Sequence, residues 1–412
     1  MTKENFIEKY GDNPQEVTRN YSAKSVGTNY DVNDCFNEFI DNIIDAKVSP
    51  ENCVNAKIFY DDAKHTLTVE DDGTGIKDPS KLFLLGGTDK EKRSDSIGKY
   101  GIGVKGATAS IATNCRYDSN KEVLVEYESA YKGKKFSKTI GYFGDELYIG
   151  DDMFEDCNPD EHYTKFMFTN VTITNISDII DSMEETFEIP LSRNNGISIM
   201  FNNRALGRTG RTSTFVGDET KETIMVGNHP TELAYRIIGN ATQSDRAFEE
   251  SGIRIYDKTT GRLLGKNTKY WEWYAGKEAQ QNICGLRCGL FIEGSIECYT
   301  VFGILPAKNG IKYKKYYKQD EFSELSDRLK EIYRQSAVTK GAATTDDLVI
   351  DGKRYILVPS KLDGELYKPM GDNEIFVKNK YKTEEVIRLI AENMSLKKKL
   401  ERKERKSNKT EE

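Results

Sequence analysis

The stretch that decides the fold is VNDCFNEFIDNIIDA, residues 32–46. A helix turns by about 100° per residue, so Glu38, Asn42 and Asp45 share one face and the apolar side chains share the other. Such a helix can pack its apolar face on a sheet and present two carboxylates and an amide to one cavity. Taken alone, the same pattern also fits an ordinary amphipathic surface helix.

A second stretch, VEDDGTGI at residues 69–76, ends a β-type run in acids and glycines. Gly73 and Gly75 allow a sharp turn and the close approach of a ligand. The carboxylate of Asp71, just before them, can accept a hydrogen bond from an exocyclic amine. A simple hairpin turn is the alternative. The acids lack the spacing of an EF-hand loop, which argues against calcium.

A third stretch, SIGKYGIGVKGA at residues 96–107, places Gly98, Gly101 and Gly103 before a helical run of small residues. Glycine-rich turns at a helix N-terminus direct several backbone N–H groups to one point and suit phosphate. One such turn is weak evidence. A dinucleotide-binding fingerprint would need a strand directly before the glycines, and the polar residues there do not supply one.

In this order, the motifs ExxxNxxDA, DxGxG and GxxGxG resemble the GHKL (Bergerat-fold) ATPase family, which includes gyrase-type topoisomerases, MutL, MORC proteins, heat-shock chaperones and histidine kinases. The resemblance implies an α+β fold: an ATP-binding α/β sandwich, followed here by a transducer-type second domain of ribosomal-protein-like βαβ form and a helical tail. It also implies ATP and Mg²⁺ as ligands and a mobile lid at about residues 77–97. The lid sequence LLGGTDKEK resembles the lid start of MORC proteins.

The resemblance also implies roles for individual residues. Glu38 would be the general base that polarises the attacking water, and Asn42 would hold Mg²⁺. Asp71 would bind the adenine amine. The fourth family motif, Gly-Thr-x-Val, is matched by Phe168 to Val171, so Thr169 would complete the adenine pocket although phenylalanine replaces the glycine. The other expected nucleotide contacts are Asp45, Ala46, Gly73, Gly75, Ile76, Gly98, Tyr100, Gly101, Ile102, Gly103, Val104 and Lys105.

Two further points concern the phosphates. Lys105 lies where MORC proteins also have a lysine, and it is interpreted either as a phosphate contact or as a solvated surface lysine. The chain has three histidines, His65, His162 and His229, and none fits a phosphoacceptor helix hairpin. Hydrolysis is therefore favoured over phosphotransfer to histidine.

The second half of the chain carries a looser resemblance. FGILPAKNGIK, residues 302–312, is similar to the strand and loop of the MutL transducer domain, in which a lysine reaches the γ-phosphate. Lys308 would be that lysine; a basic loop at a strand end is the alternative. The hairpin GIRIYDKTTGRLLG, residues 252–265, resembles its MORC counterpart. We expect strands in both 285–294 and 295–307, and a helix whose apolar stripe begins at Phe322.

These patterns predict five segments. They are an N-terminal arm (1–30), the ATP-binding domain (31–205), a transducer-like α/β domain (206–340), a small β-rich extension (341–376) and a basic helical tail (377–412). In the tail, a heptad register with Asn393 at an a position is one interpretation. A solvated terminal helix is the other.

Bulk properties narrow the class of protein. The 412 residues carry a formal net charge of −7, which excludes a globally basic nucleic-acid binder but not a local basic groove. No apolar run reaches the roughly 18 residues that a membrane span needs, and the N-terminus lacks the features of a signal peptide. Seven scattered cysteines favour a reducing, cytoplasmic or nuclear compartment over a disulfide framework. Cys284 and Cys288 lack the further ligands of a metal site.

The leading functional hypothesis is an ATPase in which ATP closes two protomers into a homodimer, as in MORC-like and MutL-like clamps that engage DNA. A chaperone-like ATPase acting on a protein client is one alternative. A scaffold gated by nucleotide binding alone is another.

Overall fold

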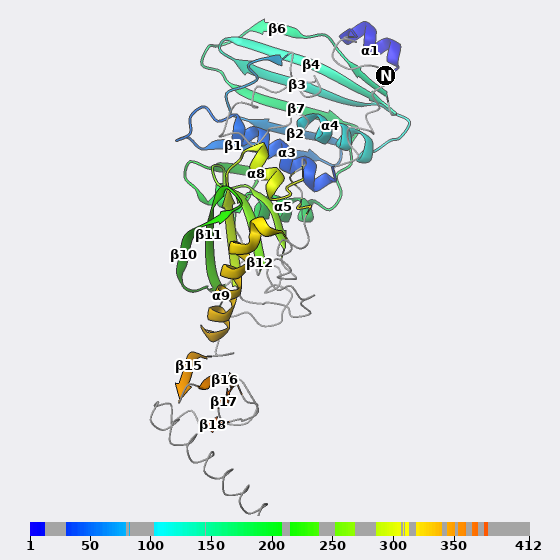
Figure 1. The fold of residues 1–412 in the computed structure, drawn as a ribbon. Coiled ribbons are helices and arrows are strands. Elements are labelled where there is room, and N and C mark those ends of the chain that lie inside the picture. Colours follow the sequence, from blue (N-terminus) through cyan, green and yellow to red (C-terminus); the bar gives the residue numbers. More distant parts are fainter. Residues whose placement is uncertain are drawn as a thin grey trace, which may run out of the picture.

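The protein is described from a computed structural model, and its described part contains three sheets that follow one another along the molecule (Figure 1). The residues described are 1–12, 30–79, 82, 103–144, 146–207, 215–238, 252–267, 286–305, 308, 310–312, 319–339, 344–350, 353–359, 365–369 and 375–377.

The first sheet has nine strands in the order β5-β4-β3-β7-β2-β1-β8-β9, with β6 paired to β4. β1 and β8 run parallel and the other pairs are antiparallel, so the sheet is mixed. Its strands are β1 (Val54–Asp61), β2 (Thr66–Asp71), β3 (Val123–Tyr131), β4 (Lys134–Phe143), β5 (Glu146–Ile149), β6 (Met153–Asp156), β7 (Tyr163–Thr169), β8 (Ile197–Phe201) and β9 (Arg204–Ala205).

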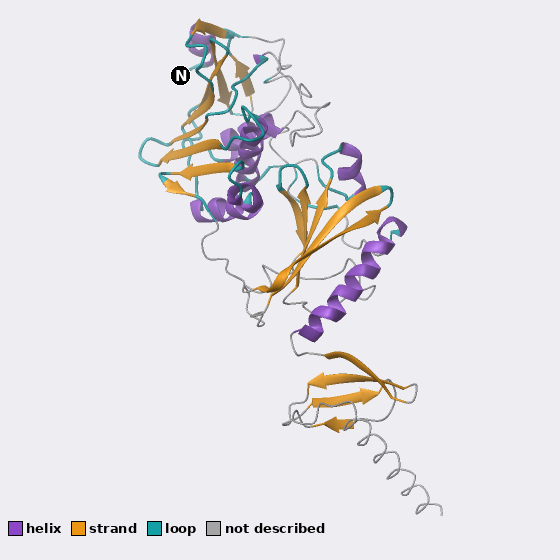
Figure 2. Cartoon of the chain, turned by 90° about the vertical axis from the view of Figure 1, so that its left-hand side faces the viewer, coloured by secondary structure: helices purple, strands orange, loops and turns teal. Residues whose placement is uncertain are grey.

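Helices cover the face of this sheet that is turned toward the second sheet (Figure 2). They are α3 (Val32–Asp45), α4 (Gly103–Asn114), α5 (Ile176–Thr186) and the short α6 (Glu188–Ser192). α3 begins at a capping box in which Asp31 and Asp34 bond each other's backbone N–H groups. The N-terminal α1 (Lys3–Tyr10) instead packs its buried Phe6 near β4.

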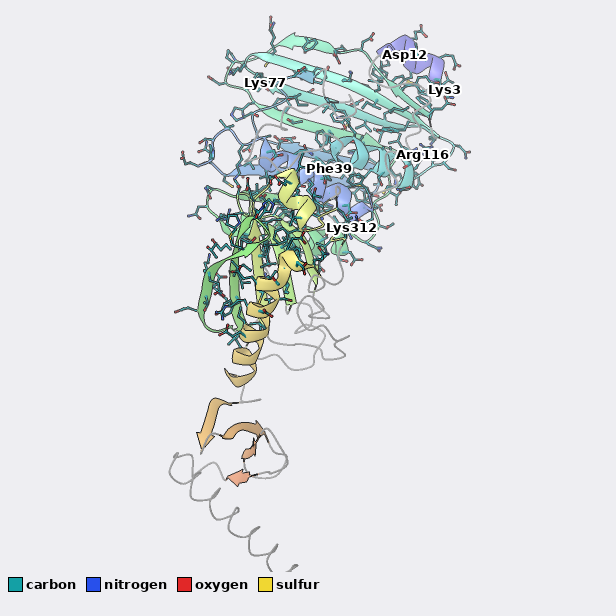
Figure 3. All side chains as sticks on the ribbon, viewed as in Figure 1. Lys3, Asp12, Phe39, Lys77, Arg116 and Lys312 are labelled. Atoms are coloured by element: carbon teal, nitrogen blue, oxygen red, sulfur yellow. The ribbon has the colours of Figure 1, made fainter. Side chains whose placement is uncertain are left out.

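The core of this domain lies between α3 and the strands. Phe36, Phe39, Ile40 and Ile43 are fully or almost fully buried, as the apolar face of the helix predicts. Phe39, labelled in Figure 3, contacts the rings of two β7 phenylalanines at centroid distances of 5.4 and 6.0 Å. Burying one such side chain stabilises the fold by about 1.5–3 kcal/mol. This packing fixes the rotation of α3 and therefore the direction of its polar face.

The second sheet has five strands in the order β10-β11-β14-β12-β13. Two helices, α8 (Ile296–Val301) and α9 (Ser323–Thr339), pack their apolar side chains into its core, and the 3₁₀ turn η3 (Asp320–Phe322) precedes α9. The expected apolar stripe is buried from Phe322 to Ile332. The strands are β10 (Phe215–Val226), β11 (His229–Ile238), β12 (Gly252–Asp257), β13 (Leu263–Asn267) and β14 (Leu286–Ile292).

One expected strand is wrong. Residues 295–307 were expected to be extended, but α8 begins there because the Ser295 hydroxyl accepts a hydrogen bond from the N–H of Cys298 at 3.1 Å and caps a helix. The buried Cys298, Tyr299 and Phe302 then pack on the second sheet. Ser295 is a typical N-cap residue and indicated a helix start, but the apolar residues that follow it favoured the interpretation as a strand.

The third sheet is an antiparallel meander of four strands, β15 (Thr344–Ile350), β16 (Lys353–Pro359), β17 (Glu365–Pro369) and β18 (Ile375–Val377). The tail after residue 377, with its proposed heptads, lies outside the described residues. Among the described helices, none combines the length and apolarity that crossing a membrane requires.

Candidate functional site

The polar face of α3 points into the interior of the molecule rather than to solvent. Glu38 is 3% exposed and Asp45 is 8% exposed, while Asn42 is half-buried. The Asn42 amide donates to the carbonyl oxygen of Glu38 at 2.7 Å. Buried carboxylates on a helix are uncommon without a partner or a task. The surface-helix interpretation of this segment is therefore excluded.

The turn after β2 is fastened to the end of α3. The carbonyl oxygen of Ala46 accepts a hydrogen bond from the N–H of Thr74 at 2.7 Å. Gly73 fits here because a Cβ would lie 2.7 Å from that same oxygen and 2.8 Å from Asp71 Oδ1. Gly75 has a φ of +76°, and its Cβ would lie 2.0 Å from the carbonyl oxygen of Ala130. Both glycines are thus required by close backbone contacts.

Asp71 ends β2 at the floor of this turn. Its Oδ1 accepts a hydrogen bond from the N–H of Gly73 at 2.8 Å. Burial raises the pKa of Asp71 to about 7, although backbone hydrogen bonds from Gly73 and Thr164 oppose the shift. Beside the turn, the N–H of Ile76 donates to the Ser129 hydroxyl at 2.8 Å. The sheet therefore holds a buried carboxyl group next to a tightly packed backbone turn.

The strand register contradicts the expectation for Thr169. In the pairing of β2 with β7, Asp71 lies opposite Thr164, and Thr169 lies opposite Thr66. Five residues of strand separate the two ends by about 17 Å, and an odd offset turns the side chain to the other face of the sheet. Thr169 instead accepts a bond from the N–H of Leu124 at 3.4 Å. Thr164, which is buried, is the threonine that the fold brings beside Asp71.

The N-terminus of α4 faces the middle of α3. A Cβ on Gly103 would lie 2.0 Å from Glu38 Oε2, so the absence of a side chain gives this carboxylate its space. Val104 is partly buried against the core of the domain. Lys105 is 7% exposed, and burial lowers its pKa to about 8. The interpretation of Lys105 as a solvated surface lysine is thereby excluded.

Four of the expected nucleotide contacts cannot be placed. They are Gly98, Tyr100, Gly101 and Ile102, and they lie outside the described residues. The expected lid, residues 77–97, is described only at 77–79 and 82, so its placement remains a prediction.

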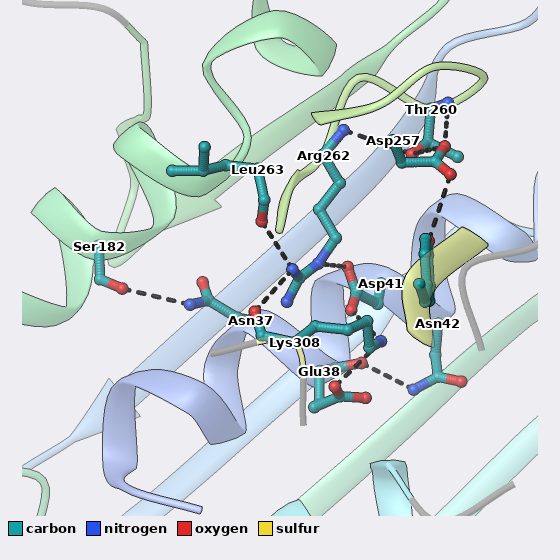
Figure 4. Close-up of polar contacts among 11 residues, drawn as sticks. Asn37, Glu38, Asp41, Asn42, Ser182, Asp257, Thr260, Arg262, Leu263 and Lys308 are labelled. Carbon is teal, nitrogen blue, oxygen red and sulfur yellow. Dashed lines mark hydrogen bonds and ion pairs between the residues drawn. The ribbon is translucent and has the colours of Figure 1, made fainter. Parts of the chain in front are cut away.

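Lys308 lies against α3 although it follows Glu38 in the sequence at a distance of 308 − 38 = 270 positions. Its Nζ is 3.0 Å from Glu38 Oε1 and 2.5 Å from Asp41 Oδ2 (Figure 4). All three side chains are almost completely buried. The alternative interpretation of Lys308 as part of a solvent-exposed basic loop is therefore excluded. Lys308 belongs to the domain of the second sheet and contacts the face of α3 that carries Glu38.

Two residues of this cluster were not expected from the sequence. Asp41 lies one helical turn from Glu38 and bonds Lys308 through Oδ2 and Arg262 Nε through Oδ1, the latter at 2.5 Å. Arg262 follows the hairpin turn between β12 and β13 and is 2% exposed. The i, i+3 spacing of Asp41 from Glu38 was a usable signal. The sequence contained no signal that Arg262 would reach α3.

The charges of the cluster shift one another's pKa values. Burial raises the pKa of Glu38 above its ordinary value, and the positive charge of Lys308 opposes this shift. Burial alone would lower the pKa of Lys308, but the carboxylates of Asp41 and Glu38 raise it. A carboxylate with a raised pKa, held beside an ammonium group, suits a general base that works near neutral pH.

Comparison with known proteins agrees with this geometry. Residues 30–164 match the family model described as "Histidine kinase-, DNA gyrase B-, and HSP90-like ATPase". These residues form a GHKL ATPase domain. The matched segment contains α3, the β2 turn and Gly103, and it ends at Thr164. The chain is accordingly an ATP-hydrolysing enzyme of α+β fold.

Other comparisons add less. A solved structure of the ATPase region of Saccharomyces cerevisiae topoisomerase II is similar at 13% identity and a TM-score of 0.42. The match covers 72% of this chain and 85% of that one, and at this level it adds no support to the GHKL assignment. No curated protein sequence matches the chain.

Proposed function

We propose that the chain hydrolyses ATP in the space between Glu38, the β2 turn and α4, with Glu38 as general base and Lys308 as the cation that meets the γ-phosphate. The observation that carries this proposal is the buried contact of Lys308 with Glu38. A cation delivered by a separate sheet would bring positive charge to the place where phosphate charge develops in the transition state. The same cation would also couple the presence of the γ-phosphate to the position of the second domain relative to the ATPase domain.

The adenine side of the site rests on Asp71. An ionised carboxylate accepts the hydrogen bond that the exocyclic amine of adenine donates, and Thr164 lies opposite it on β7. Gly73 and Gly103 let the β2 turn and the start of α4 pack tightly against Ala46 and Glu38, which keeps Asp71 and Glu38 close to these backbone segments. Lys105, which is buried on the first turn of α4, would contact the phosphates.

The donor set also fits Mg²⁺. Asn42 would hold the ion through its amide oxygen, a hard ligand of the type that magnesium prefers beside phosphate. The ion would neutralise part of the phosphate charge. Glu38, one turn earlier on α3, would keep its role of accepting a proton from water.

The replacement Glu38→Gln tests this assignment. Because the amide cannot accept the proton, we expect turnover to fall by about 100-fold or more. ATP affinity should change little, since the side chain keeps its size. Steady-state hydrolysis and equilibrium binding of a fluorescent ATP analogue measure the two quantities. Unaltered turnover would remove Glu38 from the mechanism.

We further propose that ATP binding closes two protomers into a clamp that engages DNA. The support is the buried contact of Lys308, from the second sheet's domain, with Glu38, together with the resemblance of the 252–265 hairpin to MORC proteins. Filter binding of duplex DNA should tighten with a non-hydrolysable ATP analogue and weaken steeply as salt rises. Absence of DNA binding at low salt, with and without the analogue, would contradict the clamp and leave the ATPase assignment intact.

A further inference from the structure

The hairpin between β12 and β13 is built to hold its tip in one position. Asp257 accepts bonds from the N–H and the hydroxyl of Thr260, both at 2.7 Å. Gly261 has a φ of +79°, and a Cβ there would lie 2.6 Å from Ile189 on α6. The turn is therefore packed directly against α6 of the ATPase domain. The next residue along the chain is Arg262.

Arg262 makes bonds to three different groups at the domain junction. Its Nε bonds Asp41, and its Nη1 donates to the carbonyl oxygens of Leu263 at 2.7 Å and Lys308 at 3.1 Å (Figure 4). One guanidinium group thus fixes both the backbone of Lys308 and the carboxylate that bonds the Lys308 ammonium group. The planar fork of arginine allows this; a lysine has no equivalent set of donors.

The loop that carries Lys308 needs such support. Lys308 has a φ of +53°, a left-handed conformation that L side chains other than Asn and Asp rarely adopt. The loop is closed by a bond from the N–H of Leu305 to Gly310 and by one from Lys308 to Leu305. Those bonds shape the loop but do not attach it to α3. Arg262 and Asp41 provide that attachment, together with the contact between the Lys308 ammonium group and Glu38.

Burial makes the arrangement sensitive to its members. Asp41 and Arg262 are 1% and 2% exposed, so their charges have little solvent to screen them. Removing one partner from a buried ionic cluster leaves the others uncompensated. The position of Lys308 therefore depends on Asp41 and Arg262, two residues to which the proposed reaction gives no direct role.

We propose that Arg262 and Asp41 are positioning residues for Lys308. The position of Arg262 depends on how the hairpin of the second domain packs against α6. Through its bond to Asp41, Arg262 then determines whether the Lys308 ammonium group lies beside Glu38. This inference rests on the proposed function of Lys308 and deepens it. The hairpin tip then links the angle between the domains to hydrolysis, and contact with the γ-phosphate would draw Lys308 from Glu38 while Asp41 stays bonded to Arg262.

The test compares Arg262→Met with Arg262→Lys and with Arg287→Met. Arg287 forms a different ion pair across the junction, with Glu188 at 2.7 Å. We expect Arg262→Met to lower kcat for ATP by about tenfold or more, the effect of misplacing a reacting group. KM for ATP and the affinity for ADP should stay within about twofold. Arg262→Lys should recover part of kcat, and Arg287→Met should leave kcat near the wild-type value.

Two outcomes overturn the inference. The first is a folded Arg262→Met variant with wild-type kcat. The second is a loss of kcat in Arg287→Met as large as that in Arg262→Met, which would show that Arg262 only helps to hold the two domains together. If Arg262→Met does not fold, the double variant Asp41→Asn with Arg262→Met removes both charges together. It should show the same loss of kcat as Asp41→Asn alone, because the two residues act through one interaction; a clearly larger loss than that of Asp41→Asn alone would contradict the coupling.

Glu38→Gln and Lys308→Met serve as reference variants in the same assay. If both retain wild-type turnover, the proposed function itself fails. If both lose turnover while Arg262→Met does not, the site assignment stands and the positioning role alone is overturned.

Discussion

Asp71 combines two properties that rarely occur together in a carboxyl group: a structural bond to Gly73 and a pKa of about 7, raised by burial. The adenine amine is a hydrogen-bond donor, so it favours the ionised form of Asp71. Binding of adenine must therefore compete with protonation of this group below neutral pH.

Adenosine is the probe for this competition because it has no phosphate that titrates near neutrality. If Asp71 must be ionised, a pKa of about 7 predicts binding about tenfold tighter at about pH 8 than at about pH 6. Isothermal titration at both pH values measures this ratio. Asp71→Asn should bind weakly and equally at both; a pH-independent affinity in the wild type would contradict the assignment.

At the scale of elements, the sequence predicted α3 and the β2 turn well because their motifs are local. The rotation of α3 follows from the apolar residues around Phe39, and the turn follows from Gly73. The partner of Asp71 was misplaced because a strand register is set by cross-strand pairing, which one sequence segment does not encode. Arg262 was missed for a similar reason: its contact with Asp41 depends on how two domains pack.

The N-terminus of α4 offers a test at this scale. In Gly103→Ala the new methyl group would meet Glu38 Oε2, so the carboxylate or the helix must shift. We expect turnover to fall by about tenfold or more, since small displacements of a reacting group are costly. The melting temperature should change little. Gly207→Ala is the matched control because a Cβ there meets nothing within 4 Å; wild-type turnover in Gly103→Ala would refute the close contact.

At the scale of the whole molecule, the buried cluster of Glu38, Asp41, Arg262 and Lys308 connects the domains of the two larger sheets (Figure 4). The formal charge of −7 does not favour nucleic acid globally, so an engaged partner would have to be recognised by a local surface or a closed dimer. In the proposed function, dimer closure would convert the contact with nucleotide into a change of oligomeric state.

Light scattering after size exclusion tests this step. Without nucleotide we expect a mass near 46.8 kDa, and with a saturating non-hydrolysable ATP analogue and Mg²⁺ a mass of twice that value. ADP should not produce the larger species, because it lacks the γ-phosphate that Lys308 is proposed to contact. A monomer in all three conditions, at concentrations where the analogue is shown to bind, would contradict closure.

The most direct test of the central claim, a site completed by a lysine from the second domain, is nucleotide discrimination by Lys308→Met. If Lys308 meets the γ-phosphate, turnover should fall by about 100-fold or more while ADP binds as in the wild type. Measuring kcat together with the dissociation constants of ADP and of a non-hydrolysable ATP analogue decides this. Equal losses of ADP and ATP binding would show that Lys308 only supports the fold, and wild-type turnover would contradict the claim outright.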